Sequence, residues 1–205
     1  MEAVLGQPWR GWIATPNMDE LRDCDLVRLA AAGAGGAFGR LYQRHAVGVL
    51  QYLYYRVGNA ELAEDLTQDI FMNAYAEIGS LKEPERFRSW LFAIARNRVA
   101  NHWRSQAVRP AGTELPPDDH LLATPGWSGA IGLLEDPGDS LWESEALRTA
   151  MLALTDLQRE VVLLRFTAGL SVAETAVAMG RTENAVKNLQ HHALAALRRQ
   201  MVEMP

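Results

Sequence analysis

The chain has 205 residues, 48% of them hydrophobic, and a formal net charge of −5 at pH 7. This size fits one or two small domains, and the apolar fraction is that of a folded protein. No apolar run approaches the ~20 residues that cross a membrane, and no secretory leader pattern begins the chain, so we expect neither insertion nor export. Cys24 is the only cysteine, which excludes internal disulfides and multi-cysteine zinc sites and fits a cytoplasmic protein.

The first half of the chain is predicted to be all-α. Residues 1–18 have no hydrophobic period and are expected to be a disordered extension. Apolar positions at helical spacing then predict a domain over residues 19–106, with one helix before the glycine-rich break at 33–36 and another over about 37–57. His45 lies on the inner side of that second helix. It is interpreted as a structural histidine, since no second metal ligand follows at i+4.

The helix predicted over residues 60–78 has two distinct faces. Leu62, Leu66 and Ile70 belong to an apolar stripe that continues at i+4 spacing. A second, largely acidic stripe contains Glu61, Asp65, Gln68, Asp69 and Met72. Such a stripe is most often a solvated face, and the functional alternative is a docking surface for a basic protein. Carboxylates can also perform acid–base chemistry, but an exposed helix face offers no substrate pocket.

The helix predicted over residues 86–106 is rich in arginine and aromatic residues. Only Glu83 and Glu85 oppose these arginines locally. Arginines can follow phosphates while exposed rings stack on unpaired bases, so the helix suits single-stranded nucleic acid. The alternative is a solvated basic helix with all its aromatic side chains in the core. Phe87 and Phe92 are expected in the core, and Trp90 fits either interpretation.

Residues 107–142 differ from both flanking segments. They contain several prolines and glycines, which interrupt helices, and they are acidic. Apolar residues such as Leu121, Trp127 and Ile131 are too frequent for an inert tether. The segment is therefore predicted to be a linker that contacts another molecule along its length.

The last segment, 143–205, is predicted to be a second helical domain. Thr155 and Gln158 form a capping-box pattern before a helix over 156–168, with Phe166 on its inner side, and Gly169 ends that helix. Ser171 and Glu174 form another capping box. The inner stripe of the helix that follows is expected to contain Val172, Ala173, Ala176 and Val177.

The pattern over residues 171–197 predicts a helix-turn-helix. Gly180 suits a helix end, Thr182 suits the next N-cap, and apolar residues then recur on one face of the following helix: Val186, Leu189, Ala193 and Leu197. The opposite face is polar, so the second helix could lie in the major groove of DNA. An ordinary helical hairpin with a solvated face is the alternative.

Three motifs in this order resemble a bacterial sigma factor of the extracytoplasmic-function (ECF) group. They are AEDLTQDIFMNAY (63–75), FRSWLFAIARNRVANHW (87–103) and LQREVVLLRFTAGLSVAETAVAMGRTENAVK (157–187). The resemblance implies a subunit that directs core RNA polymerase to promoters and that helps to melt them. It implies docking on the clamp helices of the β′ subunit and on the flap of the β subunit, and the linker would thread the polymerase channels. Family members are often held by an anti-sigma factor.

The resemblance also implies roles for particular residues. Core polymerase binding is expected of Glu61, Asp65, Gln68 and Asp69. Binding of the −10 element and of single-stranded DNA is expected of Lys82, Arg86, Arg88, Trp90, Asn97, Asn101 and Arg104. Binding of the duplex −35 element is expected of Arg181, Thr182, Asn184, Lys187, Asn188 and His191. Many family members have arginine where this chain has Leu189 and His192, which places more weight on the residues just named.

Three other functions are alternatives to this interpretation. A one-component regulator would use the helix-turn-helix but would leave the acidic stripe and the basic aromatic helix without a role. An enzyme is disfavoured because no phosphate loop, HExxH motif or nucleophile elbow occurs, and no cofactor or metal is expected. A protein-interaction adaptor would have no activity on DNA. The net negative charge should weaken DNA binding by the isolated chain, because affinity for DNA comes largely from neutralising phosphates.

Overall fold

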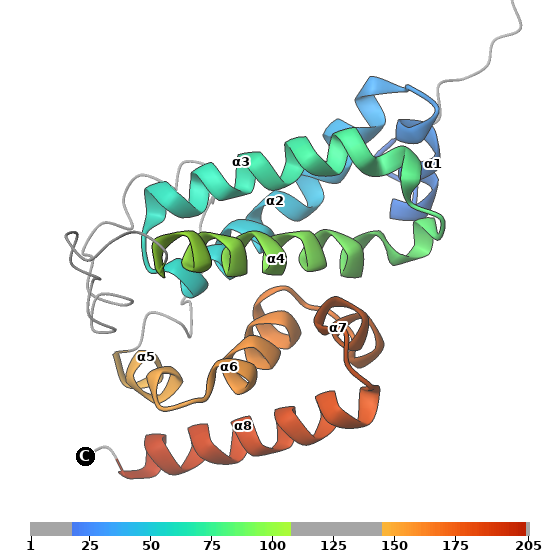
Figure 1. Cartoon of the computed structure of the whole chain (residues 1–205). Helices are drawn as coiled ribbons and strands as arrows, with labels where there is room; N and C mark the ends of the chain where they lie inside the picture. The colour runs from blue at the N-terminus through green and yellow to red at the C-terminus, as the bar shows by residue number, and fades with distance from the viewer. Residues whose placement is uncertain (1–17, 108–144, 204–205) are drawn as a thin grey trace, which may run out of the picture.

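A computed structural model describes residues 18–107 and 145–203, and these form helices and turns without any strand. The prediction of an all-α protein is confirmed for this part of the chain. Figure 1 shows the helices in two groups, with residues 18–107 above and residues 145–203 below. None of the helices within these two ranges has the length and hydrophobicity needed to span a bilayer. The expected extension at 1–18 and most of the linker at 107–142 lie outside the described residues.

The N-terminal group contains four α-helices and two short 3₁₀ turns. They are α1 (Asp23–Ala31), α2 (Gly35–Val57), α3 (Ala60–Glu77), η1 (Ile78–Ser80), η2 (Pro84–Arg86) and α4 (Phe87–Ala107). Gly58 adopts a positive φ of 69°, which ends α2, and Asn59 then caps α3 by accepting a 2.9 Å hydrogen bond from the Leu62 N–H. The segment between α3 and α4 consists largely of the two 3₁₀ turns.

The C-terminal group consists of α5 (Glu145–Leu152), α6 (Asp156–Val162), the π-helical turn η6 (Leu163–Thr167), α7 (Val172–Met179) and α8 (Glu183–Glu203). The predicted capping boxes at Thr155 and at Ser171 are both present. Gly180 has a φ of 62°, and the Thr182 hydroxyl accepts a 3.2 Å hydrogen bond from the Ala185 N–H. The predicted helix-turn-helix is therefore confirmed as α7, a tight turn and α8.

Three expected inner positions of this domain are wrong. Phe166 is 48% exposed, because the helix widens into the π turn and side chains in that turn leave the face set by α6. Val177 is 46% exposed and Ala173 is also on the surface. Helix α7 instead buries Thr175, Ala176, Ala178 and Met179, because it packs against both α4 and α8. The inner face predicted for α8 is correct at Val186, Ala193 and Leu197.

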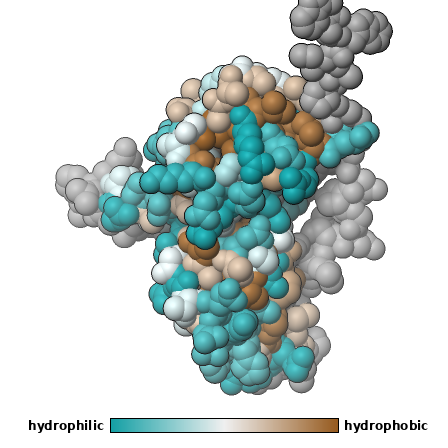
Figure 2. All heavy atoms as spheres, turned by 90° about the vertical axis from the view of Figure 1, so that its right-hand side faces the viewer, coloured by the Kyte–Doolittle hydropathy of each residue, from teal (hydrophilic) through white to brown (hydrophobic). Residues whose placement is uncertain are grey.

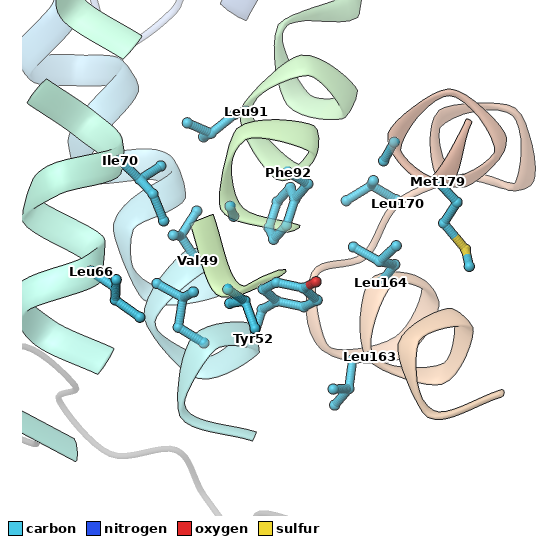
Figure 3. Packing of buried hydrophobic residues seen from close by; sticks show 14 of the residues in the cluster. Val49, Tyr52, Leu66, Ile70, Leu91, Phe92, Leu163, Leu164, Leu170 and Met179 are labelled. Atoms are coloured by element: carbon cyan, nitrogen blue, oxygen red, sulfur yellow. The ribbon is translucent and has the colours of Figure 1, made fainter. Parts of the chain in front are cut away.

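One hydrophobic core extends through both groups of helices. Figure 3 shows Tyr52 and Phe92 of the N-terminal group facing Leu164 and Leu170 of the C-terminal group, and all four belong to the same buried cluster. Phe87 and Phe92 are each 1% exposed, as predicted. Since apolar burial contributes about 25 cal/mol for each Å² removed from water, this shared core holds the two groups together.

The prediction that His45 is structural is confirmed. Its Nε2 atom lies 2.6 Å from Asp23 Oδ2, which joins α2 to α1. The hydrogen bond from His45, supported by one from Arg44, lowers the pKa of Asp23 to about 2 against the opposing effect of burial. No cluster of His, Cys, Asp and Glu that could hold a metal ion occurs within 18–107 or 145–203.

The capping box of α7 generates a stability prediction. Ser171→Ala removes the oxygen that accepts a 3.1 Å hydrogen bond from the Glu174 N–H, so the free energy of unfolding should fall by about 1 kcal/mol. Denaturant-induced unfolding followed by circular dichroism measures this change. Ser171→Asn is the matched control, because asparagine is as good an N-cap and should keep stability near that of the parent protein. Equal stability of the alanine and asparagine variants would contradict the role of the cap.

Candidate nucleic-acid and protein interfaces

The polar face of α8 is open to solvent. All six residues that the sequence singled out at this helix and its turn are exposed: Arg181, Thr182, Asn184, Lys187, Asn188 and His191. The Thr182 hydroxyl acts as the N-cap of α8. The Lys187 ammonium lies 3.8 Å from the carboxylate of Glu183, one turn earlier in the same helix. An exposed ion pair of this kind contributes little stability, so Lys187 can exchange Glu183 for a phosphate or a base edge.

Helix α4 presents a second polar face. Asn97, Asn101 and Arg104 are exposed at i, i+4 and i+7. Trp90, one to two turns earlier, is half-buried and packs on Phe87 with ring centroids 6.0 Å apart. Lys82 and Arg86 are exposed before the helix, and Arg86 lies 2.8 Å from Glu83. Five of the predicted strand-binding residues are thus exposed to solvent, and Trp90 is partly exposed.

Arg88 does not belong to that open face. Its Nη2 atom donates hydrogen bonds to the carbonyl oxygens of Ala168 and Gly169 at 2.9 and 3.0 Å, and its Nη1 atom lies 3.6 Å from Glu174 Oε1. Arg88 is therefore held by the turn that precedes α7. Arg88 is one of the residues expected to bind the −10 element, and in this structure its guanidinium contacts the C-terminal domain.

Arg96 faces the C-terminal domain in the same way. Its Nε atom lies 2.8 Å from Glu160 Oε1, and Glu160 is only 4% exposed. The Tyr52 hydroxyl lies 3.5 Å from the same carboxylate oxygen. Burial, followed by the Glu160 charge, raises the pKa of Tyr52, so this hydroxyl keeps its proton. The sequence alone assigned no role to Glu160; the available signal was a charge directly before the apolar run Val161 to Leu164.

The acidic stripe of α3 is exposed at Glu61, Asp65 and Gln68. Asp69 is half-exposed and forms an ion pair with Arg98 of α4, so its carboxylate already has a partner within the domain.

Two large apolar side chains lie farther along the same helix. Met72 is 72% exposed, and Tyr75 is 57% exposed. The Tyr75 ring packs edge-on against the Phe38 ring, with the ring centroids 5.0 Å apart. Figure 2 shows a broad apolar area on the upper, N-terminal domain within a mostly hydrophilic surface.

A groove of about 470 Å³ runs between the two domains. Glu85, Arg86 and Ser89 line it from the N-terminal domain. The opposite wall comes from the helix-turn-helix and includes Glu174, Val177, Arg181 and Glu183. The start of α4 and the start of α8, which carry candidate DNA-binding residues, therefore face one another across a single groove.

Comparison with known proteins identifies the two domains. The family model "Sigma-70 region 2" matches residues 41–109, and "Sigma-70, region 4" matches residues 144–197. The chain is 42% identical over 185 residues to the ECF RNA polymerase sigma factor BldN of Streptomyces coelicolor, covering 88% of this chain and 66% of BldN. It is 30% identical over 166 residues to the RNA polymerase sigma factor YlaC of Bacillus subtilis, and this match covers 80% of this chain and 91% of YlaC.

A solved structure of CnrH in complex with the cytosolic domain of CnrY has a similar fold, with a TM-score of 0.64 and 24% identity, over 89% of this chain and 99% of that one. The helices 18–107 and 145–203 thus correspond to the region 2 and region 4 domains of sigma factors. The chain belongs to the sigma-70 family, in its ECF group.

Proposed function

We propose that this protein is a sigma factor that binds core RNA polymerase and directs promoter-specific initiation of transcription in the cytoplasm. One observation carries the proposal: two exposed polar surfaces of different chemistry, on α4 and on α8, occur in one chain beside a separate acidic and apolar surface on α3. Run-off transcription with purified core polymerase on a genomic promoter library tests it. Transcripts that require the added protein support the proposal, and their absence from every template contradicts it.

In this proposal α8 reads the duplex −35 element. Its exposed residues Asn184, Lys187 and Asn188 can reach base edges or flanking phosphates in the major groove. The open face of α4, with Asn97, Asn101 and Arg104, binds the separated strand at the −10 element, where Trp90 offers a ring for stacking. The protein thereby assists melting and contributes no catalytic group of its own.

The charge of the chain explains why polymerase is needed. A net charge of −5 disfavours DNA binding by the isolated protein, since non-specific affinity depends on neutralised phosphates. The exposed carboxylates of α3 dock on the β′ clamp helices, and region 4 contacts the β flap. Once both domains are tethered on polymerase, the second DNA contact becomes effectively intramolecular.

An anti-sigma factor is a further partner in this proposal. A sigma factor of similar fold, RpoE of Bartonella quintana, was solved in complex with the anti-sigma factor NepR.

Asp65→Lys tests the docking surface. Reversing this exposed charge should weaken association with core polymerase by about 2 kcal/mol or more, which is about thirtyfold, because it places like charges at the interface. Co-purification and fluorescence anisotropy with core polymerase measure the effect. Glu77→Lys makes the same charge change at the other exposed end of α3 and should bind normally. Normal binding of the Asp65 variant would refute the assignment.

Lys187→Ala tests the −35 reader. Loss of one phosphate or base contact should lower initiation about tenfold at promoters that depend on their −35 element. Run-off transcription measures the yield. Arg199→Ala removes the same charge from the far, exposed end of α8 and should leave the yield unchanged. If both variants initiate equally well, Lys187 has no part in reading DNA.

Asn97→Ala tests the melting face. The variant should bind polymerase normally yet form about five- to tenfold fewer open complexes, the equivalent of one lost hydrogen bond to an unpaired base. Permanganate footprinting counts the unpaired thymines. Ser105→Ala, on the exposed last turn of α4, serves as the control. Unchanged open-complex formation by the Asn97 variant would remove this residue from the strand-binding face.

A further inference from the structure

An ion pair joins α3 to α4 at the border between two surfaces with different proposed roles. Figure 1 shows the two helices side by side, and the Nη2 atom of Arg98 on α4 donates a hydrogen bond to Oδ2 of Asp69 on α3. Residues three and four apart share a helix face, so Asp69 lies on the face of α3 that carries the exposed side chains of Asp65 and Met72. By the same spacing, Arg98 shares a face of α4 with Asn101. The pair therefore lies between the docking surface and the strand-binding surface.

Both side chains of this pair remain accessible to another molecule. The Asp69 side chain is 48% exposed, and the Arg98 side chain is 42% exposed. An ion pair in contact with water contributes little stability, because both ions keep much of their hydration and salt screens their attraction. Either ion can therefore exchange its partner for another of the same charge at small cost.

The two ions face different alternative partners. A carboxylate on the docking face of α3 is placed to meet a basic group of the protein that binds there. An arginine pairs with a phosphate through the same charge-assisted hydrogen bonds that it makes with a carboxylate. Arg98 can therefore exchange Asp69 for a phosphate of a strand bound along α4, and Asp69 can exchange Arg98 for a cation of the docked protein.

We propose that Asp69 and Arg98 form an exchange pair that couples docking on polymerase to binding of the separated DNA strand. In the free protein the Asp69 carboxylate holds the Arg98 guanidinium. On polymerase, Asp69 pairs with a basic group of the docked subunit, and Arg98 is released to a strand phosphate. The inference rests on the proposed function. It adds Arg98 to the strand-binding residues and makes Asp69 the link between the two surfaces.

The exchange makes the two binding events favour one another. In the free protein a phosphate competes with Asp69 for Arg98, whereas in the docked protein the Asp69 carboxylate is already occupied. The strand should therefore bind about three- to fivefold more tightly after docking, which is the effect of one exposed ion pair. Thermodynamic linkage requires that a bound strand strengthen docking by the same factor.

Asp69→Asn tests the exchange pair in the isolated full-length protein. The variant keeps the size of the side chain and releases Arg98, so its affinity for a random-sequence single-stranded oligonucleotide should rise about three- to fivefold. Fluorescence anisotropy at low ionic strength, where phosphate contacts are strongest, measures this affinity. The gain must depend on Arg98. When Arg98→Gln is already present, Asp69→Asn should leave the affinity unchanged.

Glu77→Gln is the matched control for charge. It removes one negative charge from an exposed position on the same helix, and its affinity for the oligonucleotide should stay close to that of the parent. A gain equal to that of Asp69→Asn would mean that net charge alone is responsible, and would overturn the proposal. A gain that persists beside Arg98→Gln would overturn it too. Far-UV circular dichroism checks that all the variants remain helical.

The polymerase complex supplies the second half of the test, at a promoter that the parent protein transcribes. Permanganate footprinting with saturating core polymerase should show about three- to fivefold fewer open complexes for Arg98→Gln. Arg199→Gln, which removes a positive charge from the exposed far end of α8, should match the parent. Asp69→Asn should give no gain here, because its partner in the complex is polymerase and Arg98 is already released.

The outcomes separate this inference from the proposed function. A gain for Asp69→Asn in the polymerase complex, or an unchanged number of open complexes for Arg98→Gln, would overturn the exchange pair. Since the parent protein still transcribes in that case, the sigma function stands. Absence of transcription by the parent from every template rejects the sigma function, and the coupling to polymerase is rejected with it.

Discussion

The ion pair between Arg96 and Glu160 joins the two halves of this protein at a buried carboxylate. A carboxylate that is 4% exposed needs a close partner, because an unpaired buried charge is costly, and the Arg96 guanidinium at 2.8 Å meets that need. Apolar side chains of both domains form the shared core, where Phe92 of α4 faces Leu164 of the C-terminal domain. The apolar burial supplies most of the attraction between the domains.

This packing divides α4 into two sides with different roles. Arg88 and Arg96 lie on the side covered by region 4, whereas Asn97, Asn101 and Arg104 remain exposed. A helix can have one covered side and one exposed side, because residues three and four apart share a face while their neighbours point elsewhere. The exposed basic surface of α4 is therefore smaller than the number of arginines in the helix would indicate.

The third surface, on α3, is independent of the domain contact. Asp65 and Gln68 are exposed, and the large side chains of Met72 and Tyr75 add an exposed apolar part to this surface. Protein interfaces commonly combine an apolar centre with a charged rim, and this surface has both. It stays exposed while the two domains are packed together.

The sequence by itself determined the helices, their caps and the helix-turn-helix. These features depend on local rules: Ser171 and Glu174 are three residues apart, Gly180 tolerates a positive φ, and the inner face of α8 repeats at helical spacing. The family resemblance rested on the same contiguous motifs. Only the tertiary structure decided which charges meet, because Arg96 and Glu160 are far apart in the chain and either could have been a solvated surface residue. The tertiary structure also decided that Phe166 lies on the surface, in a π turn, and that Asp69 pairs with Arg98. Long-range packing selects among helix faces that the sequence leaves equivalent, and no local pattern encodes that choice.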